Sequence, residues 1–277
     1  MTRAAPDPLP SEGLRVAALQ ARAIPGEVAA NGASAAALVS RAAAEGARVA
    51  ILPELHLPGY HLAGLCTDPR AEVSADEAGQ VSDPRLDPLR SSARSGVTIV
   101  VGAAVRRPDR SLTNSLLAVT PAGDVSVAYD KQHLWHSDEA ALFRPGTRTR
   151  TLDIGGWKLG LAICYDMSFP EHARAAAVTG AHAYLCPSAF ATGREHRAHV
   201  YLAARALENT VYSMFVNSVG GPADRPCDGG SVVYGPDGSS LATARGASEQ
   251  TLVTDFTPTA LAQTRKFLRM LSEYRSA

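Results

Sequence analysis

The sequence predicts an α/β fold in one domain, with mixed sheets covered by helices on their outer faces. Apolar runs typical of buried strands recur along the 277-residue chain, and helical patterns separate several of them, which favours parallel βαβ units. Turn sequences such as Pro121-Ala122-Gly123 and Gly155-Gly156 join other runs directly and predict antiparallel pairs. No repeat or low-complexity linker divides the chain, so we expect a single domain.

The first part of the chain reads as a βαβ unit followed by a loop. Leu14–Gln20 is an apolar run typical of a strand, the Ala-rich stretch Val28–Glu45 predicts a helix ended by Gly46, and Arg48–Leu52 predicts the next strand. Leu55–Arg85 has no periodicity and predicts a long, partly ordered loop of the kind that is often functional. Further expected elements are a helix at Asp87–Ser95 and strands at Val97–Val105, Ser115–Thr120 and Asp124–Tyr129.

The second part follows another irregular segment, Asp130–Gly146, and continues the alternation. Ser168 is expected to cap a helix to about Thr179, because Glu171 completes a capping-box pattern and Gly180 ends it. The other expected elements are strands at Thr151–Ile154, Lys158–Cys164, Ala183–Cys186, Val211–Val219, Gly230–Tyr234, Ser240–Ala244 and Gln250–Asp255, and helices at Glu195–Asn209 and Pro258–Leu271.

Composition narrows the class of partner. The formal net charge is +0 and no block of Lys or Arg forms a basic stripe, which argues against nucleic acid and favours a small molecule. No apolar run approaches the ~18–20 residues that cross a bilayer, so we expect no membrane contact. The Pro-containing start of the chain lacks a secretion-signal pattern, so we expect a flexible arm at residues 1–12, one domain at residues 13–277, and a cytoplasmic location. Four cysteines (Cys66, Cys164, Cys186 and Cys227) are too widely spread for a metal knuckle.

Three strands are followed by side chains that could do chemistry together. Glu54 follows the second strand, Lys131 follows the strand that ends at Tyr129, and Cys164 ends the run that begins at Lys158. Because ligands of open α/β sheets bind beyond strand ends, these side chains could meet in one cleft. A carboxylate could then take the proton of an attacking thiol, while an ammonium and the N–H of Tyr165 hold the negative charge that develops on the substrate.

These residues stand in motifs that resemble those of the nitrilase superfamily of carbon–nitrogen hydrolases. Any one motif alone is weak, but together, in family order from the first strand to about Asp255, they are specific. The matching segments are Leu52-Pro53-Glu54 with Pro58-Gly59-Tyr60, Tyr129-Asp130-Lys131-Gln132-His133-Leu134, Ile163-Cys164-Tyr165-Asp166 with Phe169-Pro170-Glu171, Arg205-Ala206-Leu207-Glu208-Asn209 with Tyr212 and Asn217, and Gly229-Gly230-Ser231 with Gly235-Pro236-Asp237-Gly238.

The resemblance implies a reaction and a set of roles. Glu54 would be the general base, Lys131 would stabilise the tetrahedral intermediate, and Cys164 would be the nucleophile that becomes an acyl thioester. Glu139, four residues before Phe143-Arg144-Pro145-Gly146, would orient groups or handle protons. The expected function is hydrolysis of a small non-peptide amide, with no metal and no cofactor. The resemblance also implies a four-layer α-β-β-α sandwich that pairs through its helical faces into a homodimer or a higher homo-oligomer.

The sequence defines the residues of the acyl pocket less well than it defines the catalytic residues. Many amide-cleaving relatives carry a Trp after the His of a Thr-Gly-x-x-His-Trp stretch, and Arg197 replaces it here, so substrate preference cannot be copied from them. The candidate pocket residues lie in irregular segments near the expected site: Tyr60, His61, Trp135, Phe190, Arg194 and Arg197.

Several alternatives stay open on the sequence. The chain could hydrolyse an N-carbamoyl amine or a nitrile, or transfer the acyl group to an amine or hydroxylamine. A protein of another class, a catalytically silent binding protein on the same fold, would be expected to lack one of Glu54, Lys131 and Cys164. Asp166 and Glu171 are expected to fix the turn and the helix start, and His196 and His199 have no partner at a metal-ligand interval.

Overall fold

The computed structural model describes residues 8–65, 67–223 and 225–275. Of the expected N-terminal arm, residues 1–7 lie outside these ranges, as does Cys66. Residues 8–12 form neither helix nor strand, and the carbonyl of Glu12 accepts a 2.8 Å hydrogen bond from the indole N–H of Trp157. The last residues before the first strand are therefore held against the body of the protein.

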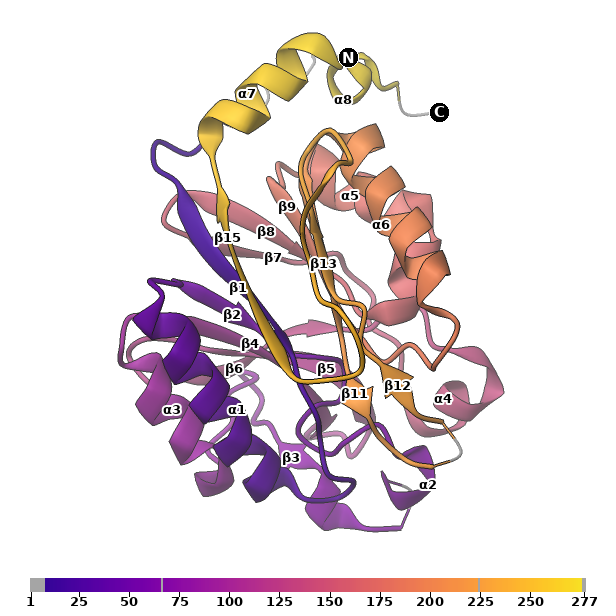
Figure 1. Ribbon diagram of the computed structural model, residues 1–277. Helices are drawn as coiled ribbons and strands as arrows, with labels where there is room; N and C mark the ends of the chain where they lie inside the picture. Colours follow the sequence, from indigo (N-terminus) through magenta and orange to yellow (C-terminus); the bar gives the residue numbers. More distant parts are fainter. Residues whose placement is uncertain (1–7, 66, 224, 276–277) are drawn as a thin grey trace.

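Two mixed sheets lie face to face at the centre of the molecule (Figure 1). The first has the order β15-β1-β2-β4-β5-β6 with β3 paired to β4, and the second has the order β14-β13-β10-β9-β8-β7. In each sheet the central strands are parallel and the flanking strands are antiparallel. A small third sheet pairs β11 (Val219–Gly220) with β12 (Cys227–Asp228).

Most strand bounds of the two large sheets lie within three residues of the predicted runs, but β3 lies in a segment that was expected to be a loop. The first sheet contains β1 (Leu14–Gln20), β2 (Val49–Ile51), β3 (Val73–Ser74), β4 (Thr98–Arg106), β5 (Leu112–Val119), β6 (Val125–Asp130) and β15 (Gln250–Phe256). The second contains β7 (Thr151–Ile154), β8 (Trp157–Leu161), β9 (Ala183–Ser188), β10 (Tyr212–Asn217), β13 (Val232–Tyr234) and β14 (Ser240–Thr243).

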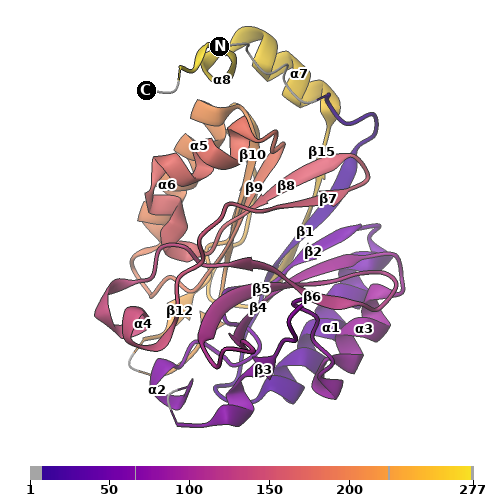
Figure 2. The ribbon, with the colours of Figure 1, turned by 180° about the vertical axis from the view of Figure 1, so that it is seen from behind.

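Helices cover the outer face of each sheet, as Figures 1 and 2 show from opposite sides. The alternation of side chains along β1 explains the layers: Val16 and Ala18 face the second sheet, while Ala17 and Leu19 join the cluster under α1. The four-layer α-β-β-α sandwich is therefore confirmed. The helices are α1 (Val28–Ala44) and α3 (Asp87–Ala93) over the first sheet, α5 (Pro170–Val178) and α6 (Glu195–Asn209) over the second, and α2 (Leu62–Leu65), α4 (His136–Leu142), α7 (Pro258–Phe267) and α8 (Met270–Glu273) elsewhere.

Some local expectations were wrong. β8 ends at Leu161 rather than at Cys164, which lies in a 3₁₀ turn, η3 (Cys164–Ser168). Ser168 does not cap the next helix: α5 begins at Pro170, whose fixed φ suits the first helical position, and Phe169 precedes it without a side-chain cap. The segment Asp130–Gly146, expected to be irregular, contains α4.

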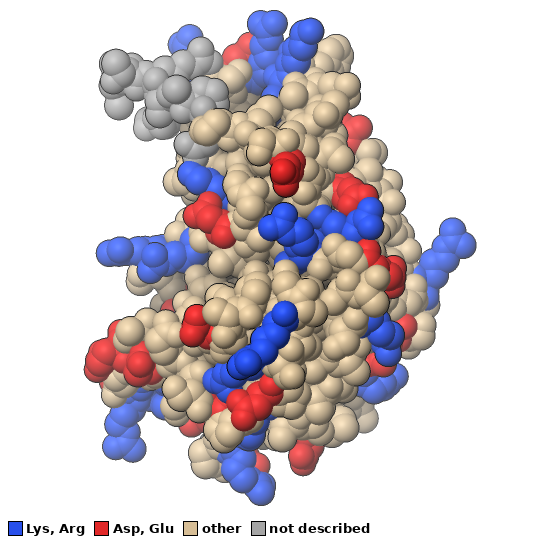
Figure 3. All heavy atoms as spheres, turned by 90° about the vertical axis from the view of Figure 1, so that its left-hand side faces the viewer, with Lys and Arg blue, Asp and Glu red and all other residues tan. Residues whose placement is uncertain are grey.

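The described residues contain no helix long and apolar enough to cross a membrane. On the face that Figure 3 shows, basic and acidic side chains are interspersed. That pattern differs from the clustered cations that bind a phosphate backbone.

Candidate active site

The site forms where strand ends of both sheets meet. β4 is parallel to β2 and antiparallel to β5, and β6 is antiparallel to β5, so β2 and β6 run in the same direction. Glu54, shortly after β2, and Lys131, directly after β6, therefore emerge at the same edge of the first sheet. Cys164 follows β8 of the second sheet and completes the group.

Three donors, from β5 and from the residues that follow β6 and β9, hold Glu54. Its Oε1 accepts hydrogen bonds from the Nδ2 of Asn114 on β5 at 2.8 Å and from the Nζ of Lys131 at 2.7 Å. Its Oε2 accepts one from the N–H of Ala189, after β9, at 3.1 Å. Gly102 on β4 makes room for this arrangement, because an added Cβ would lie 2.3–2.7 Å from the Pro53–Leu55 backbone. The carboxylate is thus fixed before a substrate binds.

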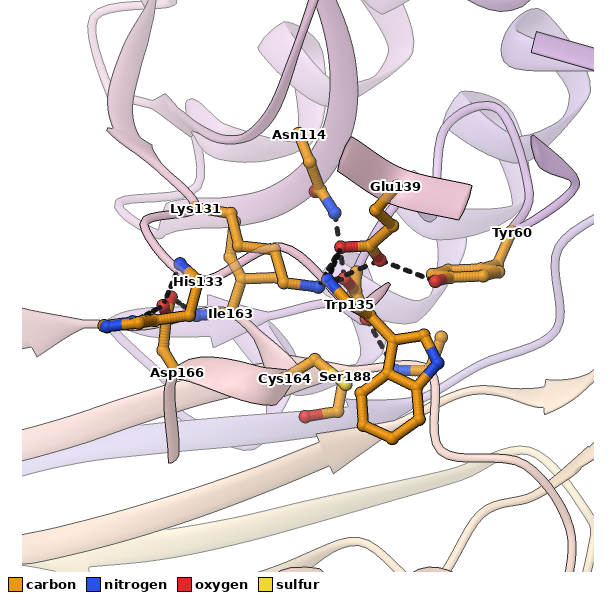
Figure 4. A network of polar contacts seen from close by, with 12 residues as sticks. Tyr60, Asn114, Lys131, His133, Trp135, Glu139, Ile163, Cys164, Asp166 and Ser188 are labelled. Atoms are coloured by element: carbon orange, nitrogen blue, oxygen red, sulfur yellow. Dashed lines mark hydrogen bonds and ion pairs between the residues drawn. The ribbon is translucent and has the colours of Figure 1, made fainter. Parts of the chain in front are cut away.

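Lys131 lies between two carboxylates (Figure 4). Besides Glu54, its Nζ contacts both oxygens of Glu139 at 2.9 and 2.8 Å. Glu139 also accepts hydrogen bonds from the hydroxyl of Tyr60 at 2.5 Å and from the N–H of Trp135 at 2.7 Å. All three charged side chains are fully buried, so their geometry depends on these contacts rather than on water.

Cys164 lies on a strained backbone beside this cluster. Its φ of 45° falls in the left-handed region that a non-glycine residue rarely adopts, and such strain is common at functional sites. The residue is 8% exposed, against 1% for Glu54 and Lys131, so Cys164 is the least buried residue of the three. The N–H of Tyr165 lies in the first turn of η3, where N–H groups have no partner within the helix.

Asp166 fixes the turn that carries Cys164. Its Oδ2 accepts hydrogen bonds from the N–H of Ile163 at 2.9 Å and from the hydroxyl of Tyr129 at 2.7 Å. Its Oδ1 accepts one from the N–H of His133 at 2.9 Å and lies 2.8 Å from the Nδ1 of the same residue. The ring of His172 lies 2.9 Å from the Tyr129 hydroxyl and extends the network beneath the turn. The structure thus supports the expected role of Asp166 in holding the turn.

We expect an Asp166→Asn variant to lower kcat by about 10- to 100-fold and the free energy of unfolding by about 2–3 kcal/mol. An amide has one accepting oxygen, so its NH₂ group would face the donors of either Ile163 or His133. Amide-hydrolysis kinetics and urea denaturation measure the two effects. Asp138→Asn, at an exposed position of α4, is the matched control. Wild-type kcat and stability in Asp166→Asn would contradict the positioning role.

The charges of the site shift the pKa values of its groups in different directions. Burial alone would lower the pKa of Lys131, but the carboxylates of Glu54 and Glu139 outweigh it and hold the pKa well above its usual value. Burial raises the pKa of Glu54, against the opposing charge of Lys131. Burial and the charge of Glu54 also raise the pKa of the Cys164 thiol well above its usual value. At neutral pH the resting nucleophile is therefore a thiol that needs a base.

The expected pocket residues divide into two groups. Tyr60 and Trp135 contact Glu139, the ring of Trp135 meets that of Tyr165 edge to face at 4.9 Å, and Arg197 lies 5.8 Å over the ring of Phe190. His61 instead lines a surface hollow with Pro25 and Thr67, and Arg194 is exposed at the start of α6. The structure therefore does not bring His61 and Arg194 to the catalytic cluster.

Four residues at the site carry no signal in the sequence. Asn114 lies among the polar residues at the start of β5, Ala189 contributes only its backbone, and Gly102 contributes only space. Arg225 lies in an irregular loop, and its guanidinium stacks on the ring of Tyr60 at 4.5 Å. The non-local pairing of strands and loops determines each of these contacts, so a pattern along the chain does not reveal them.

The described residues include no group of three or more His, Cys, Asp or Glu side chains that could hold a metal ion. The absence of a metal and a cofactor stays a prediction. Likewise, the catalytic roles of Glu54, Lys131, Glu139 and Cys164 stay predictions, although the structure brings the four side chains together.

Known proteins share both the sequence pattern and the fold. A family model described as carbon–nitrogen hydrolase matches residues 15–266. A hydrolase in the pqqF 5′ region of Pseudomonas protegens is 31% identical over 81% of this chain and 77% of its own length. The deaminated glutathione amidase of Escherichia coli O157:H7 is 30% identical over 87% of this chain and 90% of its own.

A solved structure of an amidase also shares the fold of this chain. NitN amidase of Nesterenkonia sp. AN1 superposes with a TM-score of 0.80 at 30% identity, covering 95% of this chain and 96% of that one. The motif resemblance is thereby confirmed. The chain belongs to the carbon–nitrogen hydrolase family of the nitrilase superfamily.

Proposed function

We propose that this chain hydrolyses the C–N bond of a small, non-peptide amide through a thioester on Cys164. The observation that carries the proposal is the buried Glu54–Lys131–Glu139 cluster beside the Cys164 thiol, whose backbone is left-handed. A base, a cation and a nucleophile fixed in advance are what amide cleavage requires. A silent binding protein would have no need to bury these charges together.

In the first half of the reaction, the Sγ of Cys164 attacks the amide carbon while Glu54 takes the thiol proton. A C–S bond forms and the carbonyl electron pair moves to oxygen. The Lys131 ammonium and the N–H of Tyr165 stabilise this oxyanion. The tetrahedral intermediate then collapses. The C–N bond breaks, Glu54 returns its proton to nitrogen, and ammonia or an amine departs. The acyl group stays on Cys164 as the thioester.

In the second half, Glu54 takes a proton from water as the water oxygen attacks the thioester carbon. The same donors hold the second oxyanion. The C–S bond then breaks, the proton passes to sulfur, and the carboxylic acid leaves. Glu139 keeps the Lys131 ammonium in place throughout, with Tyr60 and the N–H of Trp135 fixing Glu139 in turn.

The names of relatives support the amide class. They include a 2-oxoglutaramate amidase from Bacillus subtilis and the omega-amidase of Mus musculus, each 30% identical to this chain. Structures of the Nesterenkonia amidase hold acrylamide, and one carries the acetamide moiety of fluoroacetamide covalently bound to the active-site cysteine. We propose the same nucleophile here.

The pH dependence of kcat/KM tests this scheme. Only ionised Glu54 accepts the thiol proton, and its raised pKa moves the acid limb above the usual carboxyl range. The rate is therefore expected to fall as pH drops through that pKa and to level off above it. Ammonia release from butyramide, measured from about pH 4 to about pH 9, gives the profile without a charge change in the substrate.

A different profile would point to a different base. If attack came from a thiolate formed without Glu54, the rate would keep rising about tenfold per pH unit through neutral pH, because the pKa of Cys164 is well above its usual value. That result, or no release of ammonia from any simple amide, would contradict the scheme.

Three further expectations become proposals. Residues 13–277 act as one domain, since strands of both sheets contribute to one apolar cluster. The chain pairs through its outer helices, where Val178 of α5 and Val200 and Leu207 of α6 are exposed; size-exclusion chromatography tests this pairing. The cytoplasmic location rests on the sequence alone and stays a prediction.

A further inference from the structure

Arg225 lies beside the catalytic cluster on the connection between β11 and β12. Its guanidinium carbon lies 4.5 Å from the ring centroid of Tyr60, whose hydroxyl donates to Glu139. The loop is tied down next to Arg225, because the carbonyl of Pro226 accepts hydrogen bonds from the N–H and the hydroxyl of Thr192 at 2.8 and 3.1 Å. The guanidinium is thus held one side chain away from the Lys131–Glu139 pair.

The described residues offer this cation no carboxylate partner. Among the residues that the structure describes, no Asp or Glu oxygen lies within 4.0 Å of Arg225, whereas the partly buried Arg85, Arg106 and Arg107 each have one. Two other partly buried arginines without a carboxylate, Arg174 and Arg265, donate to backbone carbonyls instead. Arg225 is half-buried, and a guanidinium removed from water is costly unless an anion pairs with it. An anion that fits is a ligand supplied from outside the chain.

The charge on Arg225 acts on the reacting groups. Burial alone would lower its pKa, but Tyr60, Cys164 and Glu54 together raise it, which places the guanidinium within electrostatic range of the nucleophile and the base. Two carboxylates and one ammonium otherwise leave the cluster with an excess of negative charge. Such a cluster would repel an anionic substrate, and Arg225 offsets that repulsion.

We propose that Arg225 binds a carboxylate at the far end of the acyl group, so that the preferred substrates are monoamides of dicarboxylic acids. The planar guanidinium matches a carboxylate with two parallel hydrogen bonds, and stacking on Tyr60 fixes its plane. This inference rests on the proposed amide hydrolysis, with the amide carbon at Cys164 and the carboxylate at Arg225. It assigns substrate choice to Arg225.

Matched substrates test the proposal. Malonamate, succinamate and glutaramate are compared with propionamide, butyramide and valeramide, in which a methyl group replaces the carboxylate. The wild-type enzyme is expected to show a higher kcat/KM for the best anionic amide than for its neutral partner. In Arg225→Gln, the ratio of the two kcat/KM values should fall by about 10- to 100-fold. Arg225→Lys keeps the charge but loses the planar pair of N–H donors, so its ratio should lie between those of the wild type and Arg225→Gln.

Inhibition provides a second measurement that does not depend on turnover of an anionic amide. Succinate should inhibit butyramide hydrolysis competitively, and its inhibition constant should rise by about 10- to 100-fold in Arg225→Gln. Arg41→Gln, which removes an exposed arginine of α1, should leave both the ratio and the inhibition constant as in the wild type. Thermal melting checks that each variant is folded.

The possible failures are distinguishable. A wild-type enzyme that cleaves the neutral amides and does not prefer the anionic ones overturns the role of Arg225 and leaves the proposed function intact. So does an Arg225→Gln variant that slows both series equally, since that result would mean that the guanidinium acts on the nucleophile or the base. Failure to cleave any amide of either series overturns the proposed function as well.

Discussion

A Cys164→Ala variant is expected to lose amide hydrolysis by a factor of about 10⁴ or more while keeping the fold. Alanine removes the only atom that can form the thioester in the proposed scheme. The hydrogen bonds from the N–H groups of Ile163 and His133 to Asp166 do not involve the Cys164 side chain, so they should keep η3 in place. Initial rates of ammonia release and circular dichroism measure the two outcomes.

Two further variants separate the nucleophile from a general need for thiols. Cys164→Ser keeps a side chain of similar size. Its hydroxyl should be a poor nucleophile beside a base that is positioned for a thiol, so amide hydrolysis should be lost in this variant too. Cys227→Ala removes another buried thiol and should keep turnover. A Cys164→Ala enzyme with the wild-type rate would contradict the assignment of the nucleophile.

Lys131→Met is expected to damage both stability and catalysis. It leaves the buried carboxylates of Glu54 and Glu139 facing each other without a cation, which should cost about 3–5 kcal/mol in the free energy of unfolding at neutral pH. It also removes the charge that holds the oxyanion, so kcat should fall by about 10²–10³-fold. Urea denaturation and steady-state kinetics measure the two losses.

The stability loss should depend on pH in a definite direction. Protonation of the carboxylates removes their repulsion, so the difference in unfolding free energy between Lys131→Met and the wild type should shrink as pH falls. Lys266→Met, at an exposed position of α7, should show no such pattern. A Lys131→Met variant as stable as the wild type at neutral pH would mean that the buried ion pairs do not hold the cluster together.

The parts of the fold that the sequence predicts are those with a strong local pattern. The apolar run Leu14–Gln20 and the helix Glu195–Asn209 have the expected bounds in the structure. The start of α5 differs from the predicted start, because Pro170 fixes the first turn, whereas the sequence predicted Ser168 as the N-cap. α4 was missed because it is short and polar, and its buried contact is made by a single residue, Glu139.

The site residues likewise fall into those that a local pattern predicts and those that only tertiary structure brings in. Glu54, Lys131 and Cys164 could be predicted because each follows a strand, and strand ends meet at a sheet edge. Asn114 lies near the start of β5, which is antiparallel to its neighbours and lies between β2 and β6 in the sheet. Only this order of strands brings Asn114 next to Glu54. Arg225 reaches the site through a loop whose course depends on tertiary contacts.

In the proposed reaction the acyl group passes through a thioester on Cys164. Wild-type enzyme turning over butyramide is quenched with acid within a few turnovers and digested, and its peptides are weighed by mass spectrometry. One butyryl group is expected on the peptide that contains Cys164 and none on that peptide of Cys164→Ala. Ammonia release at the normal rate with the butyryl group on another residue, or with Cys164→Ala fully active, would contradict the proposed reaction.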